Sequence, residues 1–145
     1  MEKGIATRSK LLNDAFKLFS EKSYEKVSFS ELEKASHISR GSMVYYFKNK
    51  EGLFLEMLKT MFFNKSSVKS VPTAYRQSLL SFYNYFIEMI ERDRQSLNDM
   101  GIININKAMC NIEMSALSNI PSFKDEALKW YDIENNIWCE VIRHA

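Results

Sequence analysis

The sequence predicts an all-α protein: a head of three helices, joined by a fourth helix to a helical body. Apolar residues recur at every third or fourth position along most of the chain, which is the period of an amphipathic helix. Only four Gly and two Pro interrupt the 145 residues, so few positions break a helix. Hydrophobic residues make up 46% of the chain, enough to bury a core.

The head is expected to hold three helices before residue 50. The first helix is expected over about residues 6–21. Its apolar face consists of Leu11, Leu12, Ala15, Phe16, Leu18 and Phe19. The second helix begins at Ser28, which stands before Glu31 in the S-x-x-E spacing of a capping box. A tight turn at residues 35–38 and a third helix after Ser39 complete the head.

Four further helices are expected after the head, bounded by Pro, Gly and polar stretches. They are expected from about Lys50 to Phe62 with an end in the polar residues 64–67, from Pro72 to Gln95, over about residues 104–118, and after Pro121. Gly101 breaks the chain before the sixth helix. We therefore expect two domains, a helix-turn-helix head at residues 1–49 and a helical body at residues 50–145.

Charge is unevenly distributed along the chain. Residues 1–50 hold ten Lys and Arg against six Asp and Glu, whereas residues 51–145 hold ten against twelve. A basic head on a mildly acidic body suits a DNA-binding module with a regulatory body, although ordinary scatter explains the asymmetry equally well. Cys110 and Cys139 lack metal-binding spacing, so we expect buried free thiols in a reducing cytoplasm. No apolar run is long enough to span a bilayer, and we expect a cytoplasmic protein without a membrane partner.

No catalytic constellation is evident. His37 and His144 are isolated, and the chain has no glycine-rich phosphate loop, no H-E-x-x-H motif and no paired-cysteine motif. We therefore expect a protein that is not an enzyme and that needs no metal or cofactor.

Residues 28–50 have the pattern of a helix-turn-helix, whose second helix enters the DNA major groove. Arg40, Ser42 and Tyr45 lie on that helix, where their side chains can bond base edges or phosphates. Lys48 and Lys50 flank the start of the fourth helix, whose free N–H groups also favour a phosphate. The alternative for each of these residues is an ordinary solvated helix face.

The order and spacing of the residues in this half of the chain are specific. They comprise Leu-Leu-x-x-Ala-Phe-x-Leu-Phe at 11–19, Tyr24, Ser28 with Leu32, Ala35, Ile38-Ser39-Arg40-Gly41, Tyr45-Tyr46-Phe47-Lys48-Asn49-Lys50-Glu51, and Leu53. Over about residues 7–58 the chain thereby resembles the tetracycline-repressor-like (TetR/AcrR) transcriptional regulators. The resemblance implies a homodimer on double-stranded DNA with a palindromic operator. The residues expected to contact DNA are Ser28, Ser39, Arg40, Gly41, Ser42, Tyr45, Tyr46, Lys48 and Lys50.

Several positions depart from the family's pattern. Ser23 replaces a glycine that commonly ends the first helix, and Glu33 replaces a small residue between the two helices of the motif. His37 replaces the turn glycine and must adopt a left-handed or bridging conformation. Val44 replaces a tyrosine that contacts DNA. The family's dimer uses two further helices beyond the seventh, so we expect weaker or altered association for these 145 residues than for a complete protein.

The body contains aromatic and Met side chains that can line a pocket for a small effector, although at helical spacing such residues more often form core. Glu113 lies among apolar residues and could receive a cationic ligand; a salt bridge or an exposed position explains it as well. The candidate ligand-binding residues are Phe82, Phe86, Met89, Met109, Glu113, Trp130 and Tyr131.

The favoured function is a sequence-specific DNA-binding transcriptional regulator, most often a repressor in this family, released by a small apolar or aromatic ligand. The alternative is a truncated or interaction-only helical protein of the same fold that binds DNA weakly, because one chain lacks the paired recognition helices. Encoding DNA that continues beyond Ala145 with two more amphipathic helices would favour the dimeric regulator.

Overall fold

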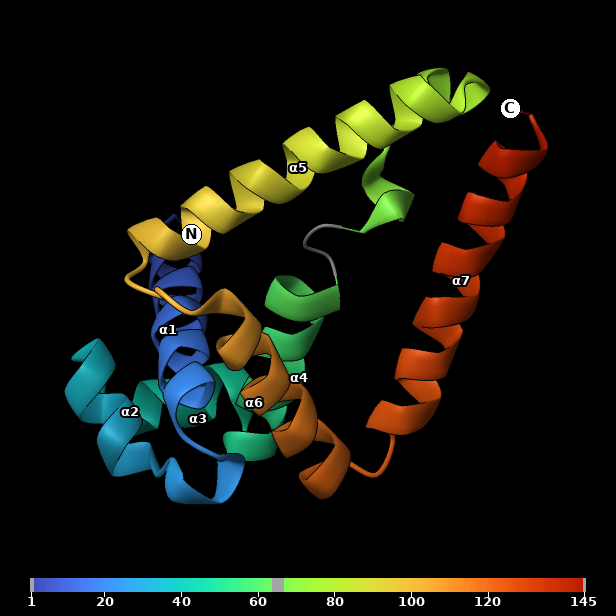
Figure 1. The fold of residues 1–145 in the computed structure, drawn as a ribbon. Coiled ribbons are helices and arrows are strands. Elements are labelled where there is room, and N and C mark those ends of the chain that lie inside the picture. Colours follow the sequence, from blue (N-terminus) through green and yellow to red (C-terminus); the bar gives the residue numbers. More distant parts are fainter. Residues whose placement is uncertain (1, 64–66, 145) are drawn as a thin grey trace.

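The computed structural model describes residues 2–63 and 67–144, and within these ranges the chain forms helices and no strands, as the sequence predicts (Figure 1). The α-helices are α1 (Glu2–Glu21), α2 (Phe29–Ser36), α3 (Arg40–Phe47), α4 (Lys50–Met57), α5 (Leu79–Asp99), α6 (Ile105–Asn119) and α7 (Phe123–Arg143). Short 3-10 turns are η1 (Tyr24–Lys26), η3 (Val68–Ser70) and η4 (Thr73–Gln77), and a π-helical turn, η2 (Leu58–Phe63), continues α4. None of the described helices is both long enough and apolar enough to cross a membrane.

Local signals set the bounds of the head helices. The Ser28 hydroxyl accepts the N–H of Glu31 at 3.2 Å, and the Glu31 carboxylate accepts the N–H of Ser28 at 3.0 Å, so the predicted capping box is confirmed. His37 ends α2 with φ 56° and ψ 27°, the left-handed conformation expected where the turn lacks glycine. Asn49 caps α4 by accepting the N–H of Gly52 at 2.7 Å.

The bounds predicted for the first and fifth helices are wrong. The first helix begins at Glu2 rather than near residue 6. Helix α4 changes after Met57 into η2, where the Thr60 hydroxyl donates to the carbonyl of Glu56 at 2.8 Å. The end expected at residues 64–67 lies partly outside the described residues. Pro72 precedes only the short turn η4; α5 begins after Ser78, whose hydroxyl accepts an N–H of the first turn, and it continues to Asp99.

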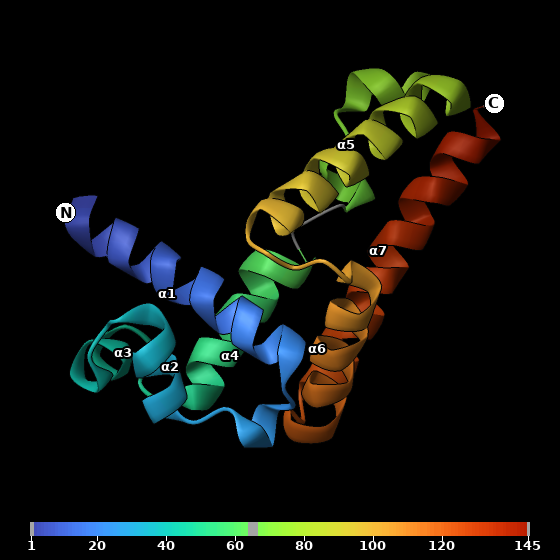
Figure 2. The ribbon, with the colours of Figure 1, turned by 60° about the vertical axis from the view of Figure 1, so that its left-hand side comes forward.

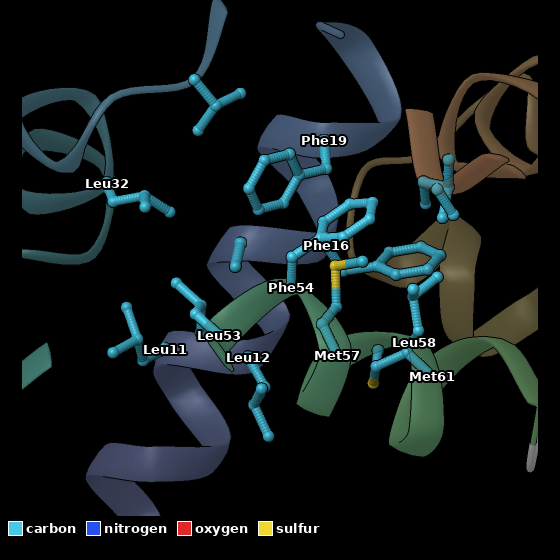
Figure 3. Close-up of a cluster of buried hydrophobic side chains, with 14 of the residues drawn as sticks. Leu11, Leu12, Phe16, Phe19, Leu32, Leu53, Phe54, Met57, Leu58 and Met61 are labelled. Carbon is cyan, nitrogen blue, oxygen red and sulfur yellow. The ribbon is translucent and has the colours of Figure 1, made fainter. Parts of the chain in front are cut away.

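One hydrophobic cluster, the main core, crosses the boundary that the sequence predicts at residues 49 and 50. Figure 3 shows side chains from α1, α2, α4 and η2 meeting there: Leu11, Leu12, Phe16, Phe19, Leu32, Leu53, Phe54, Met57, Leu58 and Met61. Ile112 and Ala116 of α6 are fully buried in the same cluster. The head and the first part of the body therefore share one core.

Helix α6 also binds the end of α1 and the connector η1 through polar contacts, and Figure 2 shows it beside α1. The Tyr24 N–H donates to the Ser115 hydroxyl at 3.1 Å, and the Asn111 amide donates to the Ser20 carbonyl at 2.9 Å. The Asn119 amide donates to the Glu25 carboxylate at 2.8 Å. This bond is the leading cause of the lowered pKa of Glu25.

A second, smaller cluster lies at the other end of the molecule, where the start of α5 approaches the end of α7 (Figure 1). Its members are Val68, Val71, Phe82, Ile137 and Val141, with Tyr85, Phe86, Met89 and Trp138 packed against them. Glu134 of α7 accepts the hydroxyl of Ser67 and the N–H of Val68, which fastens α7 to η3. Cys110 and Cys139 are free but exposed, because they lie on the outer faces of α6 and α7, so their predicted burial is wrong.

Candidate DNA-binding surface

Helix α3 turns one face to the core and the opposite face outward. Met43 and Phe47, four residues apart, are buried and anchor the helix. Tyr45 is 82% exposed and Val44 is 43% exposed, and Arg40, Gly41 and Lys48 are exposed as well. Four of the predicted DNA contacts therefore lie on one accessible surface: Arg40, Gly41, Tyr45 and Lys48.

The start of α3 is fixed by three hydrogen-bonding groups. The Ser39 hydroxyl accepts the N–H of Ser42 at 3.3 Å and lies 3.1 Å from the Ser42 hydroxyl. The Glu33 carboxylate accepts the N–H of Arg40 at 3.2 Å. The guanidinium carbon of Arg40 lies 5.5 Å from the centre of the Phe29 ring. Ser39 and Ser42 thus act as a local cap, while the guanidinium of Arg40 is available at an exposed position.

The two tyrosines of α3 differ in their surroundings. The Tyr45 ring stands in solvent and meets the Tyr46 ring edge-on, with centroids 5.2 Å apart. Tyr46 is half-buried and packs against the main core. A Cβ added at Gly4 of α1 would lie 3.4 Å from the Tyr46 hydroxyl. Tyr46 therefore joins α3 to the start of α1, whereas Tyr45 is exposed.

The reversal between α3 and α4 is tight and strained. Lys48 has φ 66° and ψ −52°, and the Asn49 N–H donates to the Phe47 carbonyl two residues earlier at 2.8 Å, which defines a γ-turn of the rare positive-φ form. A Cβ at Gly52 would lie 2.2 Å from the Phe47 carbonyl oxygen, so only glycine fits. This backbone places the exposed Lys48 beside the first turn of α4.

Lys50 does not extend freely toward a partner, in contrast to the sequence-based expectation. Its ammonium donates to the carbonyls of Tyr24 at 2.9 Å and Val27 at 3.1 Å, and it lies 4.1 Å from the centre of the Tyr24 ring. Burial, followed by the charges of Glu51 and Glu25, raises the pKa of the Tyr24 hydroxyl. Lys50 thus holds the connector η1 against α4, and a phosphate contact remains a prediction for its remaining N–H.

Ser28 is exposed, but its N–H is already used. The Glu31 carboxylate accepts that N–H and is itself held by the ammonium of Lys22 at 2.6 Å. The bond from Lys22, followed by the N–H of Ser28, lowers the pKa of Glu31. A phosphate contact by the Ser28 N–H would therefore require the Glu31 carboxylate to move aside.

The structure does not bring the seven predicted ligand residues together. Phe82, Phe86 and Met89 belong to the second cluster, where the first two rings contact Trp138 of α7. Met109 lines a separate hollow of about 260 Å³ between α5 and α6. The remaining residues are Glu113, Trp130 and Tyr131. The seven residues are apart because α5 and α7 diverge away from the second cluster (Figure 1), and a ligand contact by any of them remains a prediction.

The remaining three predicted ligand residues, Glu113, Trp130 and Tyr131, lie apart from both the second cluster and the hollow beside Met109. The Trp130 indole donates to the Phe63 carbonyl at 3.0 Å, and its ring packs against Tyr131. The Tyr131 hydroxyl lies 3.5 Å from the Glu113 carboxylate. Burial, followed by the charge of Glu113, raises the pKa of the Tyr131 hydroxyl. Glu113 thus has a tyrosine partner, whereas the sequence left open a cationic ligand, a salt bridge or an exposed position.

Two residues at the candidate surface escaped sequence reasoning. Phe29 and Glu33 both contact Arg40, whereas the sequence marked Glu33 only as a departure from the family's pattern. Their spacing of four residues on one helix was the available signal, because such residues share a face. Which residues actually touch DNA remains a prediction.

Comparisons with known proteins agree on the head. The family model described as bacterial regulatory proteins, tetR family, matches residues 11–57. The chain is 36% identical over 86 residues to the uncharacterized HTH-type transcriptional regulator YuxN of Bacillus subtilis, covering 54% of this chain and 30% of that relative. It is 27% identical over 86 residues to the biofilm operon icaADBC HTH-type negative transcriptional regulator IcaR of Staphylococcus epidermidis, covering 59% and 35%.

A third relative matches a shorter segment. The HTH-type transcriptional regulator QacR of Staphylococcus aureus is 41% identical over 51 residues, covering 35% of this chain and 27% of that relative. The chain thus matches about a third of the length of these relatives or less. No solved structure matches the chain. The matched head has a capped α2, a left-handed turn at His37 and an outward-facing α3, and over residues 11–57 the chain is similar to the tetR family of bacterial regulatory proteins.

Proposed function

We propose that the chain acts as a sequence-specific DNA-binding transcriptional regulator, and as a repressor. The observation that carries this proposal is the exposed face of α3, on which Arg40, Tyr45 and Lys48 stand clear of the core. The name of one relative, a negative transcriptional regulator, supports repression as the direction of control. The chemistry of this face is binding rather than catalysis, so we propose that the protein is not an enzyme.

The groups on this surface suit two kinds of DNA contact. In the proposed complex the start of α3 enters the major groove, and the guanidinium of Arg40 bonds a base edge. Tyr45 and Lys48 bond phosphates, which hold the protein without reading sequence. One short helix reads only a few base pairs, so we propose that two copies bind a palindromic site as a homodimer.

We further propose that a small apolar or aromatic effector controls DNA binding through η2. The aromatic contacts at this turn support the proposal: Phe63 packs against Trp130 and Phe123 of α7, with ring centroids 5.8 Å and 5.6 Å apart. A ligand wedged among these rings would move η2 and tilt α4, which carries the head. Such coupling is reciprocal, so operator DNA would weaken effector binding by the same factor.

The proposed DNA binding is tested with Tyr45→Ala, because Tyr45 contributes little to the core. We expect fluorescence anisotropy with duplex DNA at low salt to show affinity lowered by roughly fivefold or more, since a phosphate-directed group lost at the interface costs about 1 kcal/mol or more. Thermal unfolding should be unchanged. Tyr83→Ala on α5 is a matched control, because Tyr83 is also exposed, at 51%, and lies outside the head.

Salt dependence provides the second part of this test. Binding should weaken steeply with salt, and Lys48→Ala should reduce the slope of log K against log salt by about one, as expected for one lost phosphate contact. Binding without salt dependence, or equal affinities for the Tyr45 and Tyr83 variants, would contradict the proposal. No DNA binding at all would favour the interaction-only alternative.

A further inference from the structure

Two side chains of α2 meet the same residue of α3. Phe29 and Glu33 are four residues apart, so they share one face of α2. Glu33 accepts the main-chain N–H of Arg40 at 3.2 Å, and the Phe29 ring centre lies 5.5 Å from the Arg40 guanidinium carbon. One contact therefore holds the main chain of Arg40 and the other holds its side chain.

The contact from Glu33 determines where α3 begins relative to α2. The first N–H groups of a helix have no partner within the helix. In α3, Ser39 accepts the N–H of Ser42, and Glu33 accepts the N–H of Arg40, the first residue of the helix. Glu33 is thus a second cap, supplied by the neighbouring helix, and its negative charge suits the positive end of the α3 dipole.

The contact from Phe29 limits where the Arg40 side chain points. A guanidinium over an aromatic face is attracted to it, so the long side chain is drawn back toward α2. Within the described part of the chain, the Arg40 guanidinium has no ion-pair partner. The Phe29 ring therefore holds the guanidinium in place while its N–H groups form no ion pair. A group that reads a base edge has to be positioned in this way and still able to donate.

We propose that Glu33 and Phe29 are specificity-determining positioning residues, which fix the start of α3 and direct Arg40 toward a base edge. This inference rests on the proposed function, because it concerns the DNA that the same surface reads. Bidentate recognition of a guanine requires the guanidinium plane to match two acceptors, so a small displacement of the helix start removes part of the discrimination. A merely stabilising cap would instead affect all DNA sequences alike.

The test is selection of the 145-residue chain on a pool of random-sequence duplex DNA, followed by sequencing. We expect Glu33→Ala to reduce the preference at one base position per half-site by roughly threefold or more, out of the roughly 5- to 150-fold that a bidentate pair contributes. Glu33→Gln should restore the preference, because its amide oxygen can still accept the Arg40 N–H. Glu88→Ala, at an exposed carboxylate of α5, is the matched control and should change nothing.

A second variant keeps the test decisive if Glu33→Ala does not fold. Phe29→Leu retains an apolar side chain and removes the ring face, and it should reduce the preference at the same base position. An unchanged preference profile for folded Glu33→Ala and for Phe29→Leu would overturn the inference. An equal loss in Glu33→Gln and Glu33→Ala would also overturn it, because charge rather than hydrogen bonding would then be responsible. If the unsubstituted chain enriches no motif, the proposed function itself fails.

Discussion

Replacement of Lys50 by Met should destabilise the fold, because the structure uses this ammonium internally. Met retains the unbranched length of the lysine side chain and removes only the charged donor. The change leaves the carbonyls of Tyr24 and Val27 without their donor and removes the contact with the Tyr24 ring. The link between α4 and the connector η1 is lost as a result.

The magnitude follows from these contacts. A hydrogen bond to a charged group contributes about 1.5–3 kcal/mol, and an exposed cation–π contact adds about 0.5–1 kcal/mol. Lys50 is only half-buried, so solvent screening reduces the sum of two such bonds and one ring contact. We therefore expect Lys50→Met to lower the free energy of unfolding by about 2–4 kcal/mol.

The assay is urea unfolding followed by circular dichroism, with the denaturant slope compared between variants so that a change in midpoint reports stability. Lys129→Met on α7 is the control, because Lys129 is exposed. Surface substitutions of this kind stay within about 0.5 kcal/mol. If Lys50→Met is as stable as the control but loses DNA affinity, the internal role is refuted and the phosphate contact expected from the sequence is favoured.

Three further predictions concern the head and the start of α4. Gly52→Ala should lower the free energy of unfolding by about 1–3 kcal/mol in thermal or urea melts, because its Cβ would overlap a main-chain oxygen. Gly41→Ala is the control and should be neutral or stabilising, because its Cβ would meet nothing closer than 3.9 Å. Equal effects of the two substitutions would contradict the packing around Gly52. Lys48→Gly should raise the melting temperature, since relief of a positive φ that costs about 1–3 kcal/mol exceeds the added chain entropy of glycine; a lower melting temperature would argue against strain. The Glu31 pKa is lowered by Lys22 and by a backbone N–H, so its contribution to stability is present above the unfolded value of 4.5 and is lost as pH falls through the lower folded value. In urea melts taken at decreasing pH below 4.5, the Glu31→Gln variant should therefore lose less free energy of unfolding than the unsubstituted chain. An equal loss in the two proteins would count against this bond.

Features encoded by neighbouring residues were predictable from the sequence. The capping box of Ser28 and Glu31 and the left-handed His37 depend on a few adjacent positions, and both are confirmed. The family resemblance is confirmed for the same reason, because the head motif is contiguous. Ser78 is a comparable local indication of where α5 begins. The sequence favoured Pro72 instead, because proline more often starts a helix than a short 3-10 turn.

Contacts between distant segments were not predictable. The two carbonyls that hold Lys50 come from residues 26 and 23 positions earlier, and no local pattern announces them. The candidate ligand residues other than Glu113 are aromatic or Met, but the paths of α5 and α7 separate Phe86 from Trp130. Apolar periodicity gives the face that a helix buries without giving the helix that covers it.

The packing of α6 against α1 limits how the head of this chain can be combined with another body. A graft of residues 1–49 onto a foreign body would expose the apolar surface that Ile112 and Ala116 now cover. It would also lose the bonds from Asn111 and Ser115 that hold the end of α1 and η1. A functional chimaera therefore has to carry the matching face of α6 together with the head. The head and α6 form one structural unit and cannot be exchanged separately.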